Sequence, residues 1–107
     1  CGGVAEGRRF LSESALARAT SEQAYAADLV LPLHARWGLG FMLSSPHLPL
    51  DPNHRAFGHG GWGGSLGIAD PDRRLSWAYV MNKMSPGTTG DLRPMGAVTA
   101  LYAALAT

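Results

Sequence analysis

A glycine-rich run at residues 57–67 restricts the fold of this chain more than any other feature. Six of these eleven residues are glycine. Each glycine in a helix interior costs about 1 kcal/mol relative to alanine, so a helix over this run is excluded. Glycine within a strand indicates a bend or the close approach of another backbone. The run therefore predicts extended chain, and Gly64 to Ala69 reads as a strand with Leu66 and Ile68 on one face.

The segment that follows predicts a hairpin. Residues 75–81 alternate regularly, as a half-buried strand does. One face carries Leu75, Trp77, Tyr79 and Met81, and the other carries Ser76, Ala78 and Val80. Between the two segments, Asp70-Pro71-Asp72-Arg73 has the residues of a tight turn. Two strands joined by a short turn form a hairpin, and with the glycine-rich strand they predict a three-stranded antiparallel meander.

Two helices are expected, one before the strands in the sequence and one after them. Ser12 is a good N-cap residue, and strong helix formers follow it, so a short helix is predicted over 13–20. Asp91 is a plausible N-cap for a second helix that runs to about Ala106, with Pro94 in its first turn. A stripe at helical spacing along this second helix is expected to cover the meander. The stripe contains Leu92, Met95, Val98, Thr99, Tyr102 and Leu105.

The segment between the first helix and the glycine-rich run is less regular. Residues 21–36 fit no single element. Residues 36–43 alternate loosely and predict a strand, whose glycines suggest bends. Three prolines at 46, 49 and 52 predict a loop over 44–55, and a second loop is expected over 85–90. The predicted fold class is α/β of the α+β type, an antiparallel sheet flanked by helices in the order helix, strand, loop, three strands, helix.

Length and composition exclude several classes of protein. A chain of 107 residues fits one small domain or a piece of a larger one. A net charge of +1 without a basic stripe argues against nucleic acid as a partner. No apolar run approaches the roughly 20 residues of a membrane span. The chain starts at its only cysteine, Cys1, so we expect a processed chain, a fragment or an incompletely resolved protein. No compartment follows from one cysteine.

Three local patterns have a catalytic or ligand-binding interpretation that their context does not support. Gly63-Gly64-Ser65-Leu66-Gly67 matches G-x-S-x-G, but a nucleophile elbow requires a helix after the serine, and none is predicted here. The glycines lack the Lys-Ser or Lys-Thr of a phosphate-binding loop. His47, His54 and His59 match no zinc spacing, so solvent exposure is the simpler interpretation and no metal is expected.

The residues from Phe57 to Pro71, continuing from Leu75 to Met84, resemble the end of serine β-lactamase-like hydrolases. This group includes class C β-lactamases, related esterases and penicillin-binding proteins. Earlier segments fit in the same order, because Gly2 to Ser12 resembles the family's approach to a helix and Trp37 to Phe41 its Gly-Leu-Gly-aromatic strand. The resemblance implies that residues 1–107 are the C-terminal part of a β-lactamase-like domain.

The resemblance also implies a site. One active-site strand of the family carries K-T-G or a variant such as H-x-G or W-x-G, and His59-Gly60-Gly61 stands in its place here. By that resemblance His59 is the donor that faces the substrate, and Gly61, at the third position, lets the substrate lie against the strand. The implied substrate-binding residues are His59, Gly60, Gly61 and Trp62. The backbone N–H of Trp62 then joins the nucleophile's own N–H in an oxyanion hole.

Two family motifs are missing from this sequence. The family nucleophile lies in S-x-x-K, but the only lysine is Lys83 and residue 80 is valine. No Y-x-N or S-x-N motif is present either. Both motifs would lie upstream of Cys1, on the missing N-terminal part of the domain or on another chain. We therefore expect the parent to be a serine hydrolase and this chain alone to be inactive.

The expected substrate is a carboxylic ester, hydrolysed through a covalent acyl-enzyme without a cofactor. Histidine is mostly neutral at pH 7, whereas the lysine of K-T-G is a permanent cation suited to the carboxylate of a β-lactam. The alternatives are a β-lactam hydrolase, a non-catalytic binding or scaffold module, and a small enzyme that uses Ser65 with a histidine base. The third alternative requires Ser65 within hydrogen-bond reach of an imidazole.

Overall fold

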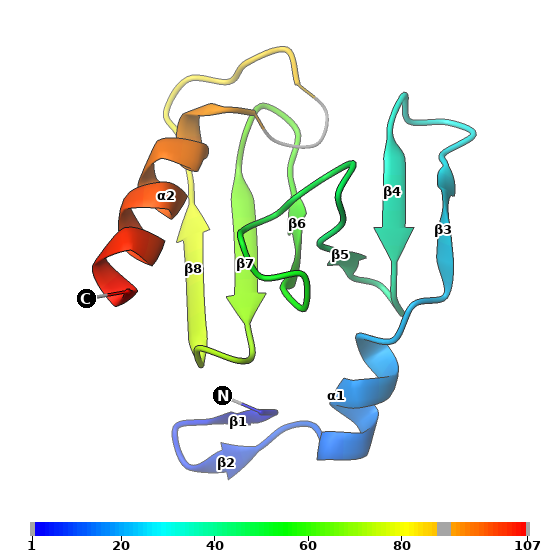
Figure 1. The fold of residues 1–107 in the computed structure, drawn as a ribbon, viewed down its shortest axis with the longest axis vertical. Helices are drawn as coiled ribbons and strands as arrows, with labels where there is room; N and C mark the ends of the chain where they lie inside the picture. The colour runs from blue at the N-terminus through cyan, green and yellow to red at the C-terminus, as the bar shows by residue number, and fades with distance from the viewer. Residues whose placement is uncertain (1, 88–90, 107) are drawn as a thin grey trace.

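The computed structural model describes residues 2–87 and 91–106 (Figure 1). In this part of the chain an antiparallel sheet of six strands has the order β3-β4-β5-β6-β7-β8. The strands are β3 (Ala24–Ala27), β4 (His34–Trp37), β5 (Met42–Leu43), β6 (Phe57–Gly60), β7 (Leu66–Asp70) and β8 (Leu75–Tyr79). A two-stranded hairpin, β1 (Val4–Ala5) with β2 (Arg8–Arg9), and the helix α1 (Glu13–Ala19) precede the sheet, and α2 (Arg93–Leu105) follows it. The α+β fold class is confirmed.

The predicted meander is confirmed as β6, β7 and β8. In the register between β6 and β7, His59 lies opposite Gly67 and Gly60 lies opposite Leu66. Asp70 pairs with Leu75 across the turn that joins β7 to β8. Figure 1 shows the β6–β7 connection and the β7–β8 turn at opposite ends of this meander. The two ends therefore present separate environments.

The single strand expected over 36–43 is wrong. The chain reverses there, because the Gly38 N–H donates to the Phe41 carbonyl over 2.8 Å and Gly40 has a φ of +80°. Two short antiparallel strands, β4 and β5, flank this turn. The first strand of the sheet, β3, falls in the segment that fitted no single element. The loop over 44–55 is confirmed, whereas residues 88–90 of the loop expected over 85–90 lie outside the described residues.

Both helices lie close to their expected positions. Ser12 caps α1, since its hydroxyl accepts a hydrogen bond from the Ala15 N–H over 3.0 Å. The helix α2 begins one residue later than expected, with Leu92 rather than Asp91 as the N-cap residue. The Asp91 carboxylate still accepts a hydrogen bond from the Arg93 N–H over 2.8 Å, so it satisfies one of the free donors of the first turn.

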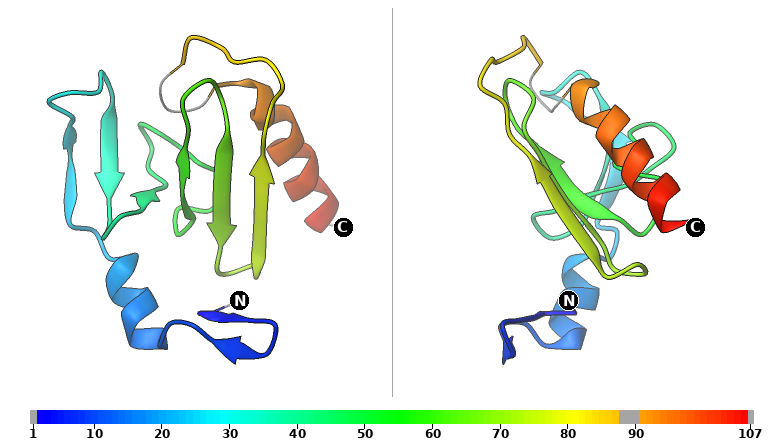
Figure 2. Two further views of the ribbon diagram at one scale, coloured as in Figure 1. Left: turned by 180° about the vertical axis from the view of Figure 1, so that it is seen from behind. Right: turned by 90° about the vertical axis from the view of Figure 1, so that its left-hand side faces the viewer.

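The core lies between α2, the 44–56 loop and one face of the sheet (Figure 2). Its buried members are Met42, Leu50, Ala56, Leu66 and Ile68. Only part of the expected stripe on α2 is buried, since Val98 and Tyr102 face the core while Leu92 is 85% exposed. Thr99 and Leu105 are exposed as well. The buried side of α2 is therefore narrower than its sequence pattern predicts.

Small residues line the opposite face of the meander. Gly67 and Ala78 form the floor of a shallow hollow of about 420 Å³, and the rings of Phe41 and Phe57 border it. At the end of the sheet order, β8 pairs only with β7 among the described residues. No helix in the described ranges is long and apolar enough to cross a lipid bilayer.

Candidate active site

The β6–β7 connection is a compact glycine turn. Inside it, the Gly61 N–H donates to the Ser65 carbonyl over 2.7 Å, and the Gly64 N–H donates to the Gly61 carbonyl over 3.1 Å. Gly63 and Gly64 have φ values of +83° and +118°, a region that side chains other than glycine rarely adopt. A Cβ on Gly61 would collide with the Ser65 hydroxyl. The glycines are therefore required by the shape of this turn.

Trp62 sits at the exposed side of the turn. Its side chain is 68% exposed. Its neighbours Gly61, Gly63 and Gly64 all use their N–H groups in backbone hydrogen bonds, but the Trp62 N–H donates to no described residue. A free backbone N–H at the surface is a ready donor for a ligand oxygen. The turn thus offers the Trp62 N–H as a donor next to the end of β6.

The exposed His59 ring is held at two points. Its Nδ1 forms a hydrogen bond with the Gly60 carbonyl, and its centroid lies 5.5 Å from a Trp37 ring centroid with an angle of 36° between the planes. A carbonyl oxygen only accepts, so Nδ1 carries the proton. In the neutral ring Nε2 is then an acceptor, and it becomes a donor only when the ring is charged. Nε2 is hydrogen-bonded to none of the described residues.

An ion pair between Arg93 and Asp91 at the start of α2 holds the glycine turn in place through hydrogen bonds, and we call this contact the brace. Arg93 donates from Nη2 to the Gly63 carbonyl over 2.7 Å and from Nη1 to the Lys83 carbonyl over 2.7 Å. Its Nε and Nη2 atoms lie 2.7 Å and 2.5 Å from one carboxylate oxygen of Asp91. Ser85 donates to the same oxygen over 2.7 Å. These hydrogen bonds, first from Arg93 and then from Ser85, hold the pKa of Asp91 well below its usual range.

Sequence reasoning missed this brace. Gly63 and Arg93 are thirty residues apart, and no local pattern links a glycine turn to an arginine in the first turn of a distant helix. The one available signal was the spacing Asp91-x-Arg93 at a helix start, where a carboxylate can cap the helix and hold the guanidinium together.

The residues with an alternative catalytic or metal-binding interpretation do not come together. Ser65 directly precedes β7, no helix follows it, and its hydroxyl makes no hydrogen bond with an imidazole in the described ranges. His47 stacks on His34 with centroids 4.3 Å apart and bonds to Tyr25, far along the chain from His59. Within the described residues, no group of three histidine, cysteine or acidic side chains is placed to hold a metal ion. Among the described residues Ser65 therefore has none of the neighbours that its interpretation as a nucleophile requires.

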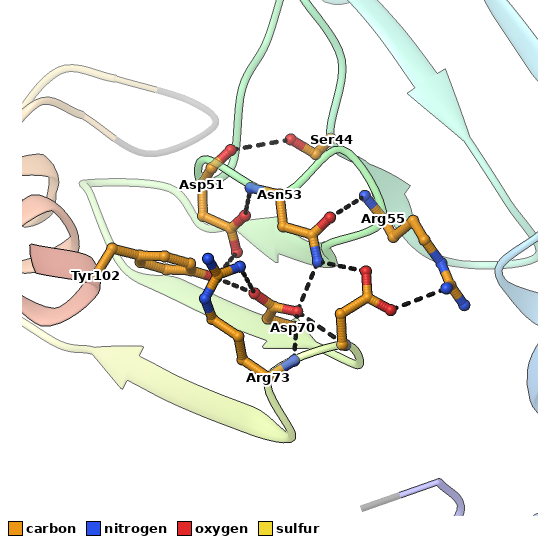
Figure 3. A network of polar contacts seen from close by, with 8 residues as sticks. Ser44, Asp51, Asn53, Arg55, Asp70, Arg73 and Tyr102 are labelled. Carbon is orange, nitrogen blue, oxygen red and sulfur yellow. Dashed lines mark hydrogen bonds and ion pairs between the residues drawn. The ribbon is translucent and has the colours of Figure 1, made fainter. Parts of the chain in front are cut away.

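A second polar cluster lies at the other end of the meander (Figure 3). Asp70 is 1% exposed and sits at the end of β7. One of its oxygens accepts from the Asn53 amide over 2.7 Å and from the Asp72 and Arg73 N–H groups. The other accepts from the Tyr102 hydroxyl over 2.5 Å. Burial alone would raise the pKa of Asp70, but the bonds from Tyr102, Asn53 and the two N–H groups bring the pKa below its usual value.

Tyr102 also contacts a second buried carboxylate, that of Asp51, over 2.9 Å. Its hydroxyl has a single hydrogen, which the two carboxylates share. Burial raises the pKa of Asp51, and the hydrogen bonds that its carboxylate accepts from the Asn53 N–H and the Tyr102 hydroxyl offset part of that rise. Burial and the hydrogen bonds to both carboxylates raise the pKa of Tyr102.

The comparisons with known proteins agree on one family. The family model for Beta-lactamase matches residues 2–101. The chain belongs to this beta-lactamase family. A penicillin-binding protein homolog from Caulobacter crescentus is 44% identical, with a TM-score of 0.89 over 95% of this chain and 28% of the homolog. A family VIII carboxylesterase is 40% identical, with a TM-score of 0.87 over 95% of this chain and 27% of the carboxylesterase.

A third structure, EstA from Arthrobacter nitroguajacolicus Rue61a, is 33% identical, with a TM-score of 0.77 over 90% of this chain and 25% of EstA. A comparison with curated proteins gave no significant match. This beta-lactamase-family chain thus spans little more than a quarter of the length of the solved structures that it matches. The resemblance to serine β-lactamase-like hydrolases is confirmed.

Proposed function

We propose that this chain supplies one wall of the active site of a serine ester hydrolase. The observation that carries the proposal is the unpaired N–H of Trp62, which follows His59-Gly60-Gly61 at the end of β6. In an oxyanion hole such a donor stabilises the negative oxygen of the tetrahedral intermediate, and it requires no rearrangement during the reaction. The free N–H, the family and the similarity to a family VIII carboxylesterase support the proposal.

The nucleophile in this proposal is a serine on the remainder of the domain. Its oxygen attacks the ester carbonyl carbon, the bond to the alcohol breaks, and the alcohol leaves with a proton. Water then attacks the acyl-enzyme, releases the acid and returns the proton to the serine. The small-residue face of the meander and the free edge of β8 are the surfaces through which we propose that this chain joins that remainder.

His59 favours an ester over a β-lactam. With Nδ1 bonded to the Gly60 carbonyl, the neutral ring presents Nε2 as an acceptor, which suits the hydroxyl of an alcohol or of water. The carboxylate of a β-lactam would need a donor, and His59 provides one only when charged. A β-lactam-binding role is the second candidate, because the penicillin-binding protein homolog is 44% identical to this chain and the family VIII carboxylesterase 40%.

The proposal is tested in a chimera in which residues 2–106 replace the matched segment of the family VIII carboxylesterase. Trp62→Pro removes the N–H, whereas Trp62→Ala keeps it and removes the side chain, so the pair isolates the donor. We expect Trp62→Pro to lower kcat for a p-nitrophenyl ester by about 100-fold or more relative to Trp62→Ala. Equal kcat values in the two variants, each still labelled by a fluorophosphonate, would contradict the proposal.

The 107-residue chain gives an independent check. Because Ser65 has no imidazole partner in the described part of the chain, treatment with a fluorophosphonate should leave the intact mass of the chain unchanged. An adduct on Ser65 would show that the chain carries its own nucleophile. Hydrolysis of nitrocefin by the chimera, without ester hydrolysis, would favour the second candidate.

A further inference from the structure

We propose that Arg93 is a positioning residue for the Trp62 N–H: its guanidinium fixes the Trp62-Gly63-Gly64 backbone from the start of α2. The inference rests on the proposed function for the meaning of the Trp62 donor. The physical claim, that Arg93 sets the direction of that N–H, holds or fails independently of any activity.

The first support is that Gly63, the residue after the donor, has both its carbonyl and its N–H in hydrogen bonds. Its carbonyl accepts from Arg93 Nη2 over 2.7 Å and from the Ser85 N–H over 2.9 Å. Its own N–H donates to the Gly87 carbonyl over 2.8 Å. Both peptide groups that flank Gly63 are therefore fixed. The Trp62 N–H belongs to the peptide group before them, and the carbonyl of that group, Gly61, accepts from the Gly64 N–H over 3.1 Å.

The second support is that Arg93 itself has a single orientation. Each nitrogen of its guanidinium has an acceptor, on Asp91, on Lys83 or on Gly63. The second carboxylate oxygen of Asp91 accepts from the Arg93 N–H, which ties the ion pair to the helix start. The planar guanidinium of Arg93 donates to acceptors in three directions, so it cannot rotate without losing a charge-assisted hydrogen bond.

The third support is the close approach of the ion pair to the turn. A Cβ on Gly64 would collide with the Asp91 carboxylate and the Arg93 guanidinium. A Cβ on Gly63 would lie 2.7 Å from the Met84 side chain. The two glycines have no side chains to hold the turn in place, and glycine backbone is the most easily reoriented of all. The brace by Arg93 supplies the restraint that these residues lack.

Orientation of the donor matters because an oxyanion hole works by preorganisation. A displacement of about 1 Å at a reacting group can reduce the rate by about 100-fold. Arg93 does not have to touch a substrate to produce such an effect. Its action runs through the Gly63 carbonyl to the Gly64 N–H of the same peptide group, which donates to the Gly61 carbonyl. The Gly61 carbonyl shares its peptide group with the Trp62 N–H.

Amide hydrogen exchange and ¹H–¹⁵N spectra of the ¹⁵N-labelled 107-residue chain test the inference. In Arg93→Gln we expect the Gly63 amide to exchange at least about tenfold faster, with shifted Trp62 and Gly63 signals, because the brace over Gly63 is lost. The amides of Ile68 and Trp77, in β7 and β8, should keep their protection. Arg18→Gln, an exposed change of equal charge on α1, is the control and should leave all these amides unchanged.

Arg93→Lys and Asp91→Asn keep the test decisive if Arg93→Gln unfolds the chain. Lysine keeps the charge and can reach one acceptor, so it should restore part of the Gly63 protection. Asp91→Asn leaves the bond from Arg93 to Gly63 possible but weakens its orientation, and it should give an intermediate exchange rate. Wild-type exchange at Gly63 in a folded Arg93→Gln or Arg93→Lys chain would overturn the inference. Loss of ester hydrolysis in the chimera alone would bear on the proposed function and not on this claim.

Discussion

The two ends of the β6–β7–β8 meander are built on opposite principles. At the β7–β8 end, Asp70 is buried, and both of its carboxylate oxygens are hydrogen-bonded (Figure 3). At the β6–β7 end, the turn is rich in glycine, its tryptophan is exposed, and one N–H has no partner among the described residues. The same strands thus connect a buried cluster of hydrogen-bonded polar groups with an exposed turn that has a free donor.

Because of this difference, substitutions at the two ends should affect different properties of the protein. A buried polar group is favourable only when every partner is present, so the Asp70 cluster should be sensitive to any single deletion. An unpaired donor contributes nothing to folding, but it is available to a ligand. Substitutions at the β7–β8 end should therefore change the free energy of unfolding, and substitutions of His59 or of the Trp62 side chain at the β6–β7 end should change activity with little effect on unfolding.

The largest expected change in stability comes from Asp70→Ala. It removes the acceptor of the Tyr102 hydroxyl, the Asn53 amide and two N–H groups, all at a buried site. We expect a loss of roughly 3–5 kcal/mol in the free energy of unfolding, the range for a broken buried charge network. Urea denaturation of the 107-residue chain measures it. A loss under about 1 kcal/mol would show that the cluster is not the stabilising end.

Tyr102→Phe should have a smaller effect, of about 1–3 kcal/mol, because it deletes one hydroxyl between two carboxylates. The effect should depend on pH. The pKa of Tyr102 in the folded chain lies above the ordinary value of 10.0, so its contribution is complete below pH 10 and is lost as the pH rises further.

The stabilities of the wild type and Tyr102→Phe should therefore converge between pH 9 and pH 11, by about 1 kcal/mol at pH 11. Urea titrations at each pH measure the difference. A gap between the two proteins that stays constant over this range would contradict the raised pKa of the hydroxyl.

His59→Ala should change stability least. The ring is exposed, so we expect the free energy of unfolding to stay within about 0.5 kcal/mol of wild type. In the carboxylesterase chimera the same change should lower kcat/KM for esters by at least about tenfold, and Trp37→Phe, which alters the ring beside His59, should have a smaller effect. Large destabilisation by His59→Ala would remove the contrast between the two ends.

Local patterns predicted the elements whose side chains follow one clear period. The alternation over 75–81 gave β8, and Ser12 gave the start of α1. The β4–β5 turn was missed because its residues are as apolar as those of a strand. The reversal shows only in the structure, in the Gly38–Phe41 hydrogen bond and the positive φ of Gly40. The length of the 36–43 segment could not distinguish one strand from two, since β5 has only two residues.

The two polar clusters needed the fold. Tyr102 bonds to Asp51, fifty-one positions earlier, and Arg93 bonds to Gly63, thirty positions earlier. Sequence patterns at helix or strand spacing carry no information on such pairs. The resemblance to the family pointed to His59 and Trp62, and their catalytic roles stay predictions. The brace behind them follows from the structure alone.

The unpaired donor at residue 62 belongs to the main chain, and this has a genetic consequence. Every amino acid except proline carries a backbone N–H, so nearly any missense change at this codon preserves the donor. Under the function that we propose, the exposed indole can therefore vary, and substrate range with it, while the donor is kept. A mutational scan that replaces only side chains would then miss the role of this position.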